Sequence, residues 1–145
     1  MSLFDLDNRV AVVTGGNGGI GLAIAKALAA EGCAVSIWGR NEEKNAQAEA
    51  AIKSRGGRVM AIACDVSDRH QAGQATLQTL EHFGRIDGCF ANAGIGGGGR
   101  AAFVDRTAEE WRQMFASIWT AFFIRFSRSS GIWSSGPPVA TASAA

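Results

Sequence analysis

One stretch constrains the fold more than any other, the segment at residues 10–21 with the sequence VAVVTGGNGGIG. Its first residues are apolar and mostly β-branched, which predicts a strand, and the residues after it repeat with helical spacing. Five glycines between them allow positive φ and let a ligand approach the backbone closely. A helix that begins there offers free N–H groups and the positive end of its dipole. The segment therefore predicts a strand-turn-helix unit that can bind a phosphate group.

Two glycine motifs fit this segment. The spacing G-x-G-x-x-G fits at Gly16, Gly18 and Gly21 and is weak evidence by itself. The spacing T-G-x3-G-x-G fits at Thr14, Gly15, Gly19 and Gly21. This second spacing resembles that of the short-chain dehydrogenase/reductase family, whose glycine loop holds the pyrophosphate of NAD(P). The alternative interpretation is that the glycines only permit a tight turn.

Composition limits the other possibilities. A chain of 145 residues suits one domain, and 47% hydrophobic residues with a net charge of +1 argue against disorder and against a nucleic-acid partner. No apolar run approaches the length of a membrane span, and the acidic start does not resemble a signal peptide. These features predict a cytoplasmic protein without a membrane partner.

The cysteines and histidines give no metal motif. Cys33, Cys64 and Cys89 are odd in number, widely spaced and in or beside predicted strands, so we interpret them as buried, reduced thiols. His70 and His82 fall on one predicted helix without a partner at ligand spacing, which predicts surface positions. We expect no metal site.

Strands and helices alternate along the chain. Strands are predicted at 9–13, 34–38, 58–64 and 87–91, and helices at 19–30, from the cap Asn41 to about residue 54, and from the cap Ser67 to Phe83 with Gly84 as its stop. Short links predict right-handed crossovers and a parallel sheet. The third strand is almost continuously apolar, as strands covered on both faces are. The family resemblance implies a Rossmann-like, doubly wound α/β sheet in the order 3-2-1-4.

A further helix is predicted to begin at Thr107, which forms a capping box with Glu110. Large apolar residues recur at helical spacing from Trp111 to Phe126. Core packing explains much of this stripe, and in the resembled family the same helix commonly forms a dimer interface, so we expect a homo-oligomer. We divide the chain into a dinucleotide-binding domain at 1–126 and an irregular tail, rich in Ser, Gly, Pro and Ala, at 127–145.

Two more motifs carry the resemblance. Cys64-Asp65-Val66 closes the third strand, and Ala91-Asn92-Ala93-Gly94 resembles the family's N-N-A-G signature. The resemblance implies that Asp65 accepts a hydrogen bond from the adenine amino group, and that Asn92 lines the cofactor. Alone, these two residues would be interpreted as a loop acid and a turn residue. The predicted cofactor-binding residues are Thr14, Gly15, Asn17, Gly19, Ile20, Gly21, Arg40, Asn41, Asp65, Val66, Asn92, Ala93 and Gly94.

The choice of cofactor depends on the end of the second strand. An NAD site needs an acid there for the ribose hydroxyls, whereas a 2′-phosphate needs a cation. Gly39 stands where the acid would be, and Arg40 follows with a guanidinium that can hold a phosphate through two hydrogen bonds. This pattern favours NADP over NAD. The alternative is a solvated surface arginine.

The resemblance fails at catalysis. The family uses Ser, Tyr and Lys with an Asn, but this chain has no tyrosine, and its lysines are Lys26, Lys44 and Lys53 on the first two helices. Ile118 stands where the family has Asn, and Ser134-Ser135 is the candidate serine motif. We therefore predict no catalytic residues and a truncated oxidoreductase, inactive alone. The rival interpretations are a non-enzymatic NAD(P)-binding regulatory module and a frameshifted product without function.

Overall fold

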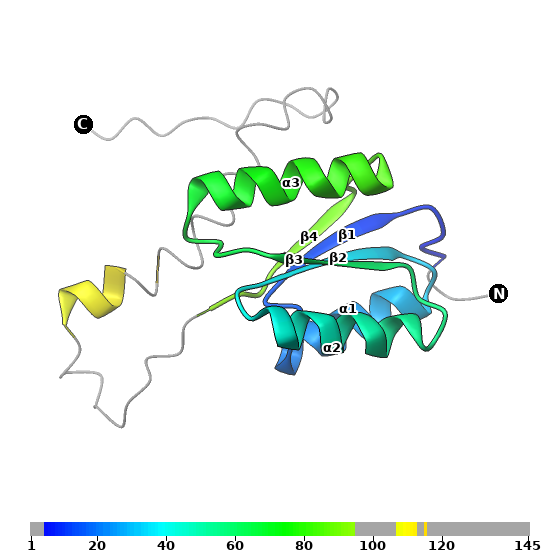
Figure 1. Ribbon diagram of the computed structural model, residues 1–145, viewed down its shortest axis with the longest axis horizontal. Helices are drawn as coiled ribbons and strands as arrows, with labels where there is room; N and C mark the ends of the chain where they lie inside the picture. The colour runs from blue at the N-terminus through cyan, green and yellow to red at the C-terminus, as the bar shows by residue number, and fades with distance from the viewer. Residues whose placement is uncertain (1–4, 95–106, 113–114, 116–145) are drawn as a thin grey trace.

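The computed structural model describes residues 5–94, 107–112 and 115 (Figure 1). The elements are β1 (Val10–Thr14), α1 (Gly19–Ala30), β2 (Ala34–Gly39), α2 (Glu42–Lys53), β3 (Val59–Ala63), α3 (Arg69–Phe83) and β4 (Gly88–Ala91). All strand pairs are parallel, and the sheet order is β3-β2-β1-β4. The predicted class, a Rossmann-like α/β sheet with this strand order, is confirmed.

The sheet lies between two helical layers. Helices α1 and α2 cover one face, and α3 covers the other (Figure 1). The chain moves from β1 through β2 to β3 in one direction, and β4 then pairs on the opposite side of β1. The order therefore reverses between β1 and β4, and ligands of open α/β sheets bind outside the carboxyl ends of strands at such a point.

Each face of the sheet has its own apolar core. Val13 and Ile37 belong to the cluster on the side of α1 and α2, whereas Val12 and Trp38 belong to the cluster that includes the inner residues of α3. Every residue of β1 and β2 is buried. Burial on both faces explains why these central strands are apolar almost throughout.

The edge strand β3 is covered on both faces, as its apolar sequence predicted. Val59 belongs to the core cluster on the side of α1 and α2 and Ile62 to the cluster with α3, although β3 pairs only with β2 in the described sheet and Ala63 is exposed. Its apolar run consists partly of small side chains, which an edge position tolerates. Strand boundaries differ from the predictions by about one residue, so β1 ends at Thr14 and β2 at Gly39.

Helix caps follow the sequence with one exception. Asn41 caps α2 by accepting a hydrogen bond from the Lys44 N–H, and Gly84 ends α3 with a φ of 78°, both as predicted. The predicted cap Ser67 is wrong. Asp68 caps α3 because its carboxylate accepts from two N–H groups of the first turn, and the Ser67 hydroxyl instead donates to Asp65.

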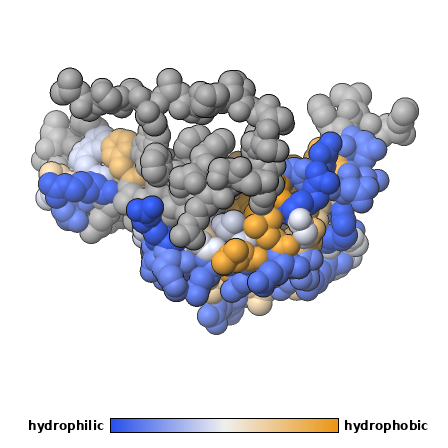
Figure 2. Space-filling model, turned by 90° about the horizontal axis from the view of Figure 1, so that it is seen from above, coloured by the Kyte–Doolittle hydropathy of each residue, from blue (hydrophilic) through white to orange (hydrophobic). Residues whose placement is uncertain are grey.

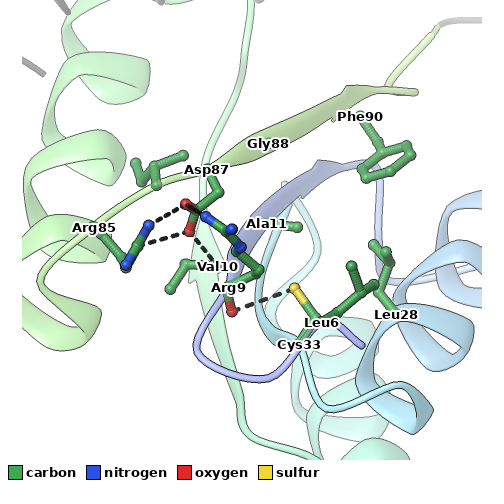
Figure 3. A pocket seen from close by; sticks show the side chains of 11 residues that line it. Leu6, Arg9, Val10, Ala11, Leu28, Cys33, Arg85, Asp87, Gly88 and Phe90 are labelled. Atoms are coloured by element: carbon green, nitrogen blue, oxygen red, sulfur yellow. Dashed lines mark hydrogen bonds and ion pairs between the residues drawn. The ribbon is translucent and has the colours of Figure 1, made fainter. Parts of the chain in front are cut away.

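An ionic cluster joins the beginnings of β1 and β4 (Figure 3). The Asp87 carboxylate accepts hydrogen bonds from the guanidinium groups of Arg85 and Arg9 and from the backbone N–H of Val10. Burial alone would raise the pKa of Asp87, but these three donors outweigh it and hold the pKa below its usual value. The cluster fixes the position of β4 beside β1.

The remaining predictions on the described residues vary in outcome. Cys33 and Cys64 are buried free thiols as expected, but Cys89 is only half-buried. His70 and His82 are exposed, as predicted. Across the described ranges no group of His, Cys, Asp and Glu could hold a metal ion, and no helix is long and apolar enough to cross a membrane.

The capping box of the later helix is confirmed. The Thr107 hydroxyl accepts from the Glu110 N–H at 3.2 Å, and the Glu110 carboxylate accepts from the Thr107 N–H at 2.8 Å. The rings of Trp111 and Phe115 stack with centroids 5.3 Å apart. Most of the predicted apolar stripe, together with Ile118, Ser134-Ser135 and the tail at 127–145, lies outside the described residues.

Candidate functional site

A cleft of about 510 Å³ lies at the carboxyl ends of the strands, where the strand order reverses. The loops that follow β1, β2, β3 and β4 all contribute to its walls. Ten of the thirteen predicted cofactor-binding residues line it: Gly15, Asn17, Gly19, Arg40, Asn41, Asp65, Val66, Asn92, Ala93 and Gly94. Four segments that are far apart in the sequence are thus brought together at this cleft.

The other three predicted residues do not line the cleft. Thr14 is 1% exposed and lies at the end of β1. Gly21 is buried in α1, where an added Cβ would stand less than 3.0 Å from the Gly15 carbonyl group and the Asn92 amide. Ile20 is 75% exposed, one of the most exposed large hydrophobic side chains described.

The glycine turn distinguishes between the two motif spacings. Gly15 and Gly19 have φ values of 64° and 52°, in the left-handed region that favours glycine, and Gly21 has no room for a side chain. Gly18 is extended, with open space where a Cβ would be. Positive φ is therefore confined to Gly15 and Gly19, which belong only to the T-G-x3-G-x-G spacing. Gly21 is common to both spacings, and Gly16 of the other spacing lacks room for a side chain beside Ile37.

The beginning of α1 has no side-chain cap and no acidic residue in its first turn. In contrast, Asn41 caps α2 and Asp68 caps α3. The first N–H groups of a helix lack partners within the helix, and they carry the positive end of its dipole. Because Gly18 and Gly19 line the cleft, this end of α1 is available to an anion there.

A buried hydroxyl connects β1 to the loop after β4. Thr14 Oγ1 accepts hydrogen bonds from the backbone N–H groups of Asn92 and Ala93, each at 3.0 Å. The Asn92 amide donates in return to the Thr14 carbonyl at 3.3 Å. Thr14 and Asn92 thus hold the glycine turn and the end of β4 together beneath the cleft, and the sequence motifs alone had suggested contact with the ligand.

Two cations lie at the wall after β2. Arg40 and Lys44 are exposed, both line the cleft, and neither forms an ion pair with a described residue. The sequence analysis missed Lys44 as a site residue. Its position four residues after Arg40, in the first turn of α2, could have suggested it, because Asn41 begins the helix between them. Ser67 and the buried Trp38, also on the wall, were missed as well.

The loop after β3 presents a carboxylate. Asp65 Oδ1 accepts from the Ser67 hydroxyl at 2.6 Å and from the Ser67 N–H at 2.9 Å. These bonds, with Arg40 nearby, lower the pKa of Asp65, so the group is ionised at neutral pH. Oδ2 has no hydrogen-bond partner among the described residues and remains able to accept one. Beside it, burial and the neighbouring acids raise the pKa of the Cys64 thiol to about 11, which keeps it protonated.

A second cleft of about 660 Å³ lies near the other end of the sheet, beside the Asp87 cluster (Figure 3). Its walls include Leu28 of α1, Cys33 and the half-exposed Phe90 of β4. Although it is larger, its polar groups already bind one another, with Asp87 holding both arginines and the Cys33 thiol donating to the Arg9 carbonyl. We therefore assign the functional site to the cleft at the carboxyl ends.

The strand order and the glycine turn define a Rossmann-like α/β domain, and comparison with known proteins identifies its family. A family model described as short chain dehydrogenase matches residues 9–129. The chain belongs to the short-chain dehydrogenase/reductase family and corresponds to its N-terminal portion.

Two curated relatives illustrate the range of the family. A protein of Yarrowia lipolytica, named as a probable NADP-dependent mannitol dehydrogenase, is 42% identical over 96 residues, which are 66% of this chain and 34% of that protein. A 3beta-hydroxysteroid dehydrogenase of Mediterraneibacter gnavus is 34% identical over 118 residues, or 81% of this chain and 42% of that protein. The chain thus spans less than half the length of these relatives.

Solved structures agree with the fold. A short chain dehydrogenase from Mycobacterium smegmatis has a TM-score of 0.78 and 32% identity, covering 88% of this chain and 55% of that one. A short-chain dehydrogenase/reductase from Burkholderia phymatum, solved in complex with NAD, has a TM-score of 0.78 and 28% identity, covering 90% and 46%.

Proposed function

We propose that this chain binds a nicotinamide dinucleotide in the 510 Å³ cleft and prefers NADP to NAD. The observation that carries the proposal is the convergence of the uncapped beginning of α1, the Arg40–Lys44 pair and the Asp65 carboxylate on one cleft. The solved relative with NAD and the relative named as NADP-dependent support a ligand of this class.

The phosphates belong at the beginning of α1. Backbone N–H groups and the helix dipole stabilise negative charge there, and the glycines let the pyrophosphate approach the backbone. The adenine belongs beside Asp65, whose free Oδ2 can accept a hydrogen bond from the adenine amino group. The adenosine ribose then lies near the end of β2, between these two points, where Gly39 and Arg40 line the wall.

Charge at the ribose end favours a 2′-phosphate. No acidic side chain stands at Gly39 to accept the ribose hydroxyls, and Arg40 and Lys44 place on the wall two cations that have no ion-pair partner among the described residues. A guanidinium–phosphate contact that is partly shielded from water contributes about 1.5–3 kcal/mol, which is roughly a tenfold or greater gain in affinity. Lys44 adds a point charge whose effect decreases with salt.

The test is a fluorescence titration with NADPH and NADH. We expect Arg40→Ala to weaken NADPH binding about tenfold or more, and Lys44→Ala to weaken it less, with little change for NADH. Arg55→Ala is the matched control, because Arg55 is exposed and lies outside the cleft. Equal affinities of the unmodified chain for the two cofactors would refute the NADP preference.

Binding is proposed without turnover by these 145 residues alone. Hydride transfer to a carbonyl builds negative charge on oxygen, and a positioned proton donor typically contributes 10²–10⁴ in rate. The family's tyrosine is that donor, and the sequence contains no tyrosine. Purified chain incubated with NADPH and a panel of ketones and aldehydes should show no steady loss of absorbance. Steady turnover by the purified chain that is lost in the Gly19→Asp variant of the glycine turn would overturn the proposal that these residues bind without catalysing.

Location and assembly are proposals of the same kind. The three cysteines, free in the structure, support a reducing compartment, and we propose the cytoplasm. We propose self-association because β4 pairs only with β1 in the described sheet, which leaves an edge of unpaired backbone groups. The exposed rings of Phe90 and Phe115 support it.

A further inference from the structure

A buried amide on α2 connects three elements of the cleft. Asn45 is 4% exposed, and its side-chain N–H groups donate to the Gly39 carbonyl at 2.8 Å and to the Ile62 carbonyl at 3.2 Å. Its Oδ1 accepts from the side chain of Asn17, in the glycine turn, at 2.7 Å. Both the nitrogen and the oxygen of the Asn45 amide are thus hydrogen-bonded, which offsets the cost of burying it.

The same pair of asparagines occupies the space beside Gly39. A Cβ added to Gly39 would stand less than 3.0 Å from Asn17 Nδ2 and Cγ, and 2.7 Å from Asn45 Oδ1. The φ of Gly39 is not in the left-handed region, so backbone conformation does not require glycine there. The restriction is one of space. It comes from the ends of the Asn17 and Asn45 side chains, which are held beside Gly39 by their mutual hydrogen bond and by the bonds of Asn45 to two backbone carbonyls.

Residue 39 ends β2, where an acidic side chain would accept the ribose hydroxyls of NAD. We propose that the Asn17–Asn45 pair is a specificity-determining device: it excludes any side chain at position 39, and so keeps a carboxylate out of the ribose end of the cleft. This inference rests on the proposed dinucleotide binding. It adds that two residues, neither of which needs to touch the 2′-phosphate, restrict the choice between NAD and NADP.

The steric part of the proposal is tested without any cofactor. We expect Gly39→Ala to lower the Tm by about 5–10 °C in the unmodified chain, as overpacking does, and by less than half as much in an Asn17→Ala background. Gly57→Ala is the matched control. A Cβ at Gly57 would also be crowded, within 2.6 Å of Ile52, but Asn17 is not among its neighbours. Its effect should therefore be the same in both backgrounds.

The specificity part is tested by titration with NADPH and NADH. Gly39→Asp alone should weaken the binding of both cofactors, because the carboxylate has no room. Gly39→Asp in the Asn17→Ala background should instead lower the NADPH-to-NADH affinity ratio at least tenfold relative to Asn17→Ala alone. Gly39→Asp in an Asn45→Ala background should also lower the ratio, and removing both asparagines should not double the effect, because the two side chains belong to one hydrogen-bonded pair.

The outcomes separate the two proposals. Equal Tm losses for Gly39→Ala in both backgrounds would overturn the steric device, as would Gly39→Asp alone gaining NADH as well as the double variant does. A folded chain that binds neither NADPH nor NADH would refute the proposed function. In that case the Tm losses of Gly39→Ala in the two backgrounds would still decide whether the asparagine pair excludes a side chain.

Discussion

The chain of hydrogen bonds between β2 and α3 yields a stability prediction with a matched control. Trp38 Nε1 donates to Ser36 Oγ at 2.9 Å, Ser36 Oγ lies 2.9 Å from Thr79 Oγ1, and Thr79 Oγ1 lies 2.8 Å from the Ala75 carbonyl. A hydroxyl has one proton, and the Thr79 proton goes to Ala75, so Ser36 must donate to Thr79. Ser36 and Thr79 are both 0% exposed.

Thr79→Val keeps the shape of the side chain and removes its oxygen. The buried Ser36 hydroxyl then loses its acceptor, which costs about 1–3 kcal/mol, and the added methyl group recovers up to about 0.8 kcal/mol. We expect a net loss of about 1–2 kcal/mol in the free energy of unfolding. For a chain near 150 residues, each kcal/mol corresponds to about 2–4 °C in Tm.

Thr76→Val is the control on the same helix. Thr76 Oγ1 makes the same bond to the carbonyl four residues earlier, also at 2.8 Å, but it is half-buried and has no second hydroxyl partner. Its replacement should change stability by less than about 0.5 kcal/mol. Urea denaturation followed by circular dichroism measures both variants. Equal losses, or an unchanged Thr79→Val, would refute the assigned role of the buried chain of bonds.

Three other outcomes are expected. The pKa of Asp87 is lowered in the folded state, so the stability that the ionised carboxylate contributes is complete above its usual pKa of 3.8 and disappears as the pH falls through the folded pKa. Asp87→Asn should therefore lower the urea midpoint at pH 7 and make that midpoint less dependent on pH in the acid range. Cys64, with a pKa of about 11, should resist iodoacetamide at pH 8 in the native state and react after denaturation, as mass spectrometry would detect; rapid native labelling would contradict its burial. Light scattering at tens of micromolar should detect species larger than a monomer, and a clean monomer would count against the exposed β4 edge.

The sequence predicted the fold well because the decisive signals are local. Strand β1, the glycine turn and α1 occupy one continuous segment, and the caps at Asn41 and Gly84 act on the nearest helix turn. The cap of α3 shows the limit of such signals. Ser67 and Asp68 are both good cap residues, and the choice between them depends on the Ser67 hydroxyl binding Asp65 instead.

The buried polar pairs could not be predicted in the same way. Asn17 and Asn45 are 28 residues apart and Ser36 and Thr79 are 43 apart, so no local spacing relates them. In a hydropathy pattern each of these four side chains is simply a polar residue on a helix, strand or turn, and polar residues are mostly exposed. Lys44 differs from these pairs, because the cap at Asn41 places it in the first turn of α2 close to Arg40, and this local signal was overlooked.

Exposed apolar side chains also required the structure. Figure 2 shows hydrophobic residues between hydrophilic ones on the face that includes α3. Leu77 on α3 is 58% exposed and Ile20 on α1 is 75% exposed, although helical spacing alone would assign such residues to the core. Their position relative to the neighbouring elements, rather than their hydropathy, determines whether they are covered.

Hydrogen bonds within the chain hold the loops around the cleft in place. Thr14 binds the chain after β4, Asn45 binds the glycine turn through Asn17, and Asp65 binds its own loop through Ser67. Ordering a loop on binding costs conformational entropy, which reduces affinity. Because these bonds are made within the chain itself, they limit the conformations of the cleft loops, and a dinucleotide that enters the cleft needs to order little of the described chain. Removing one of these bonds should therefore weaken the binding of NADPH and NADH together, whereas replacing Arg40 or Lys44 should weaken only the binding of NADPH, which has the additional phosphate.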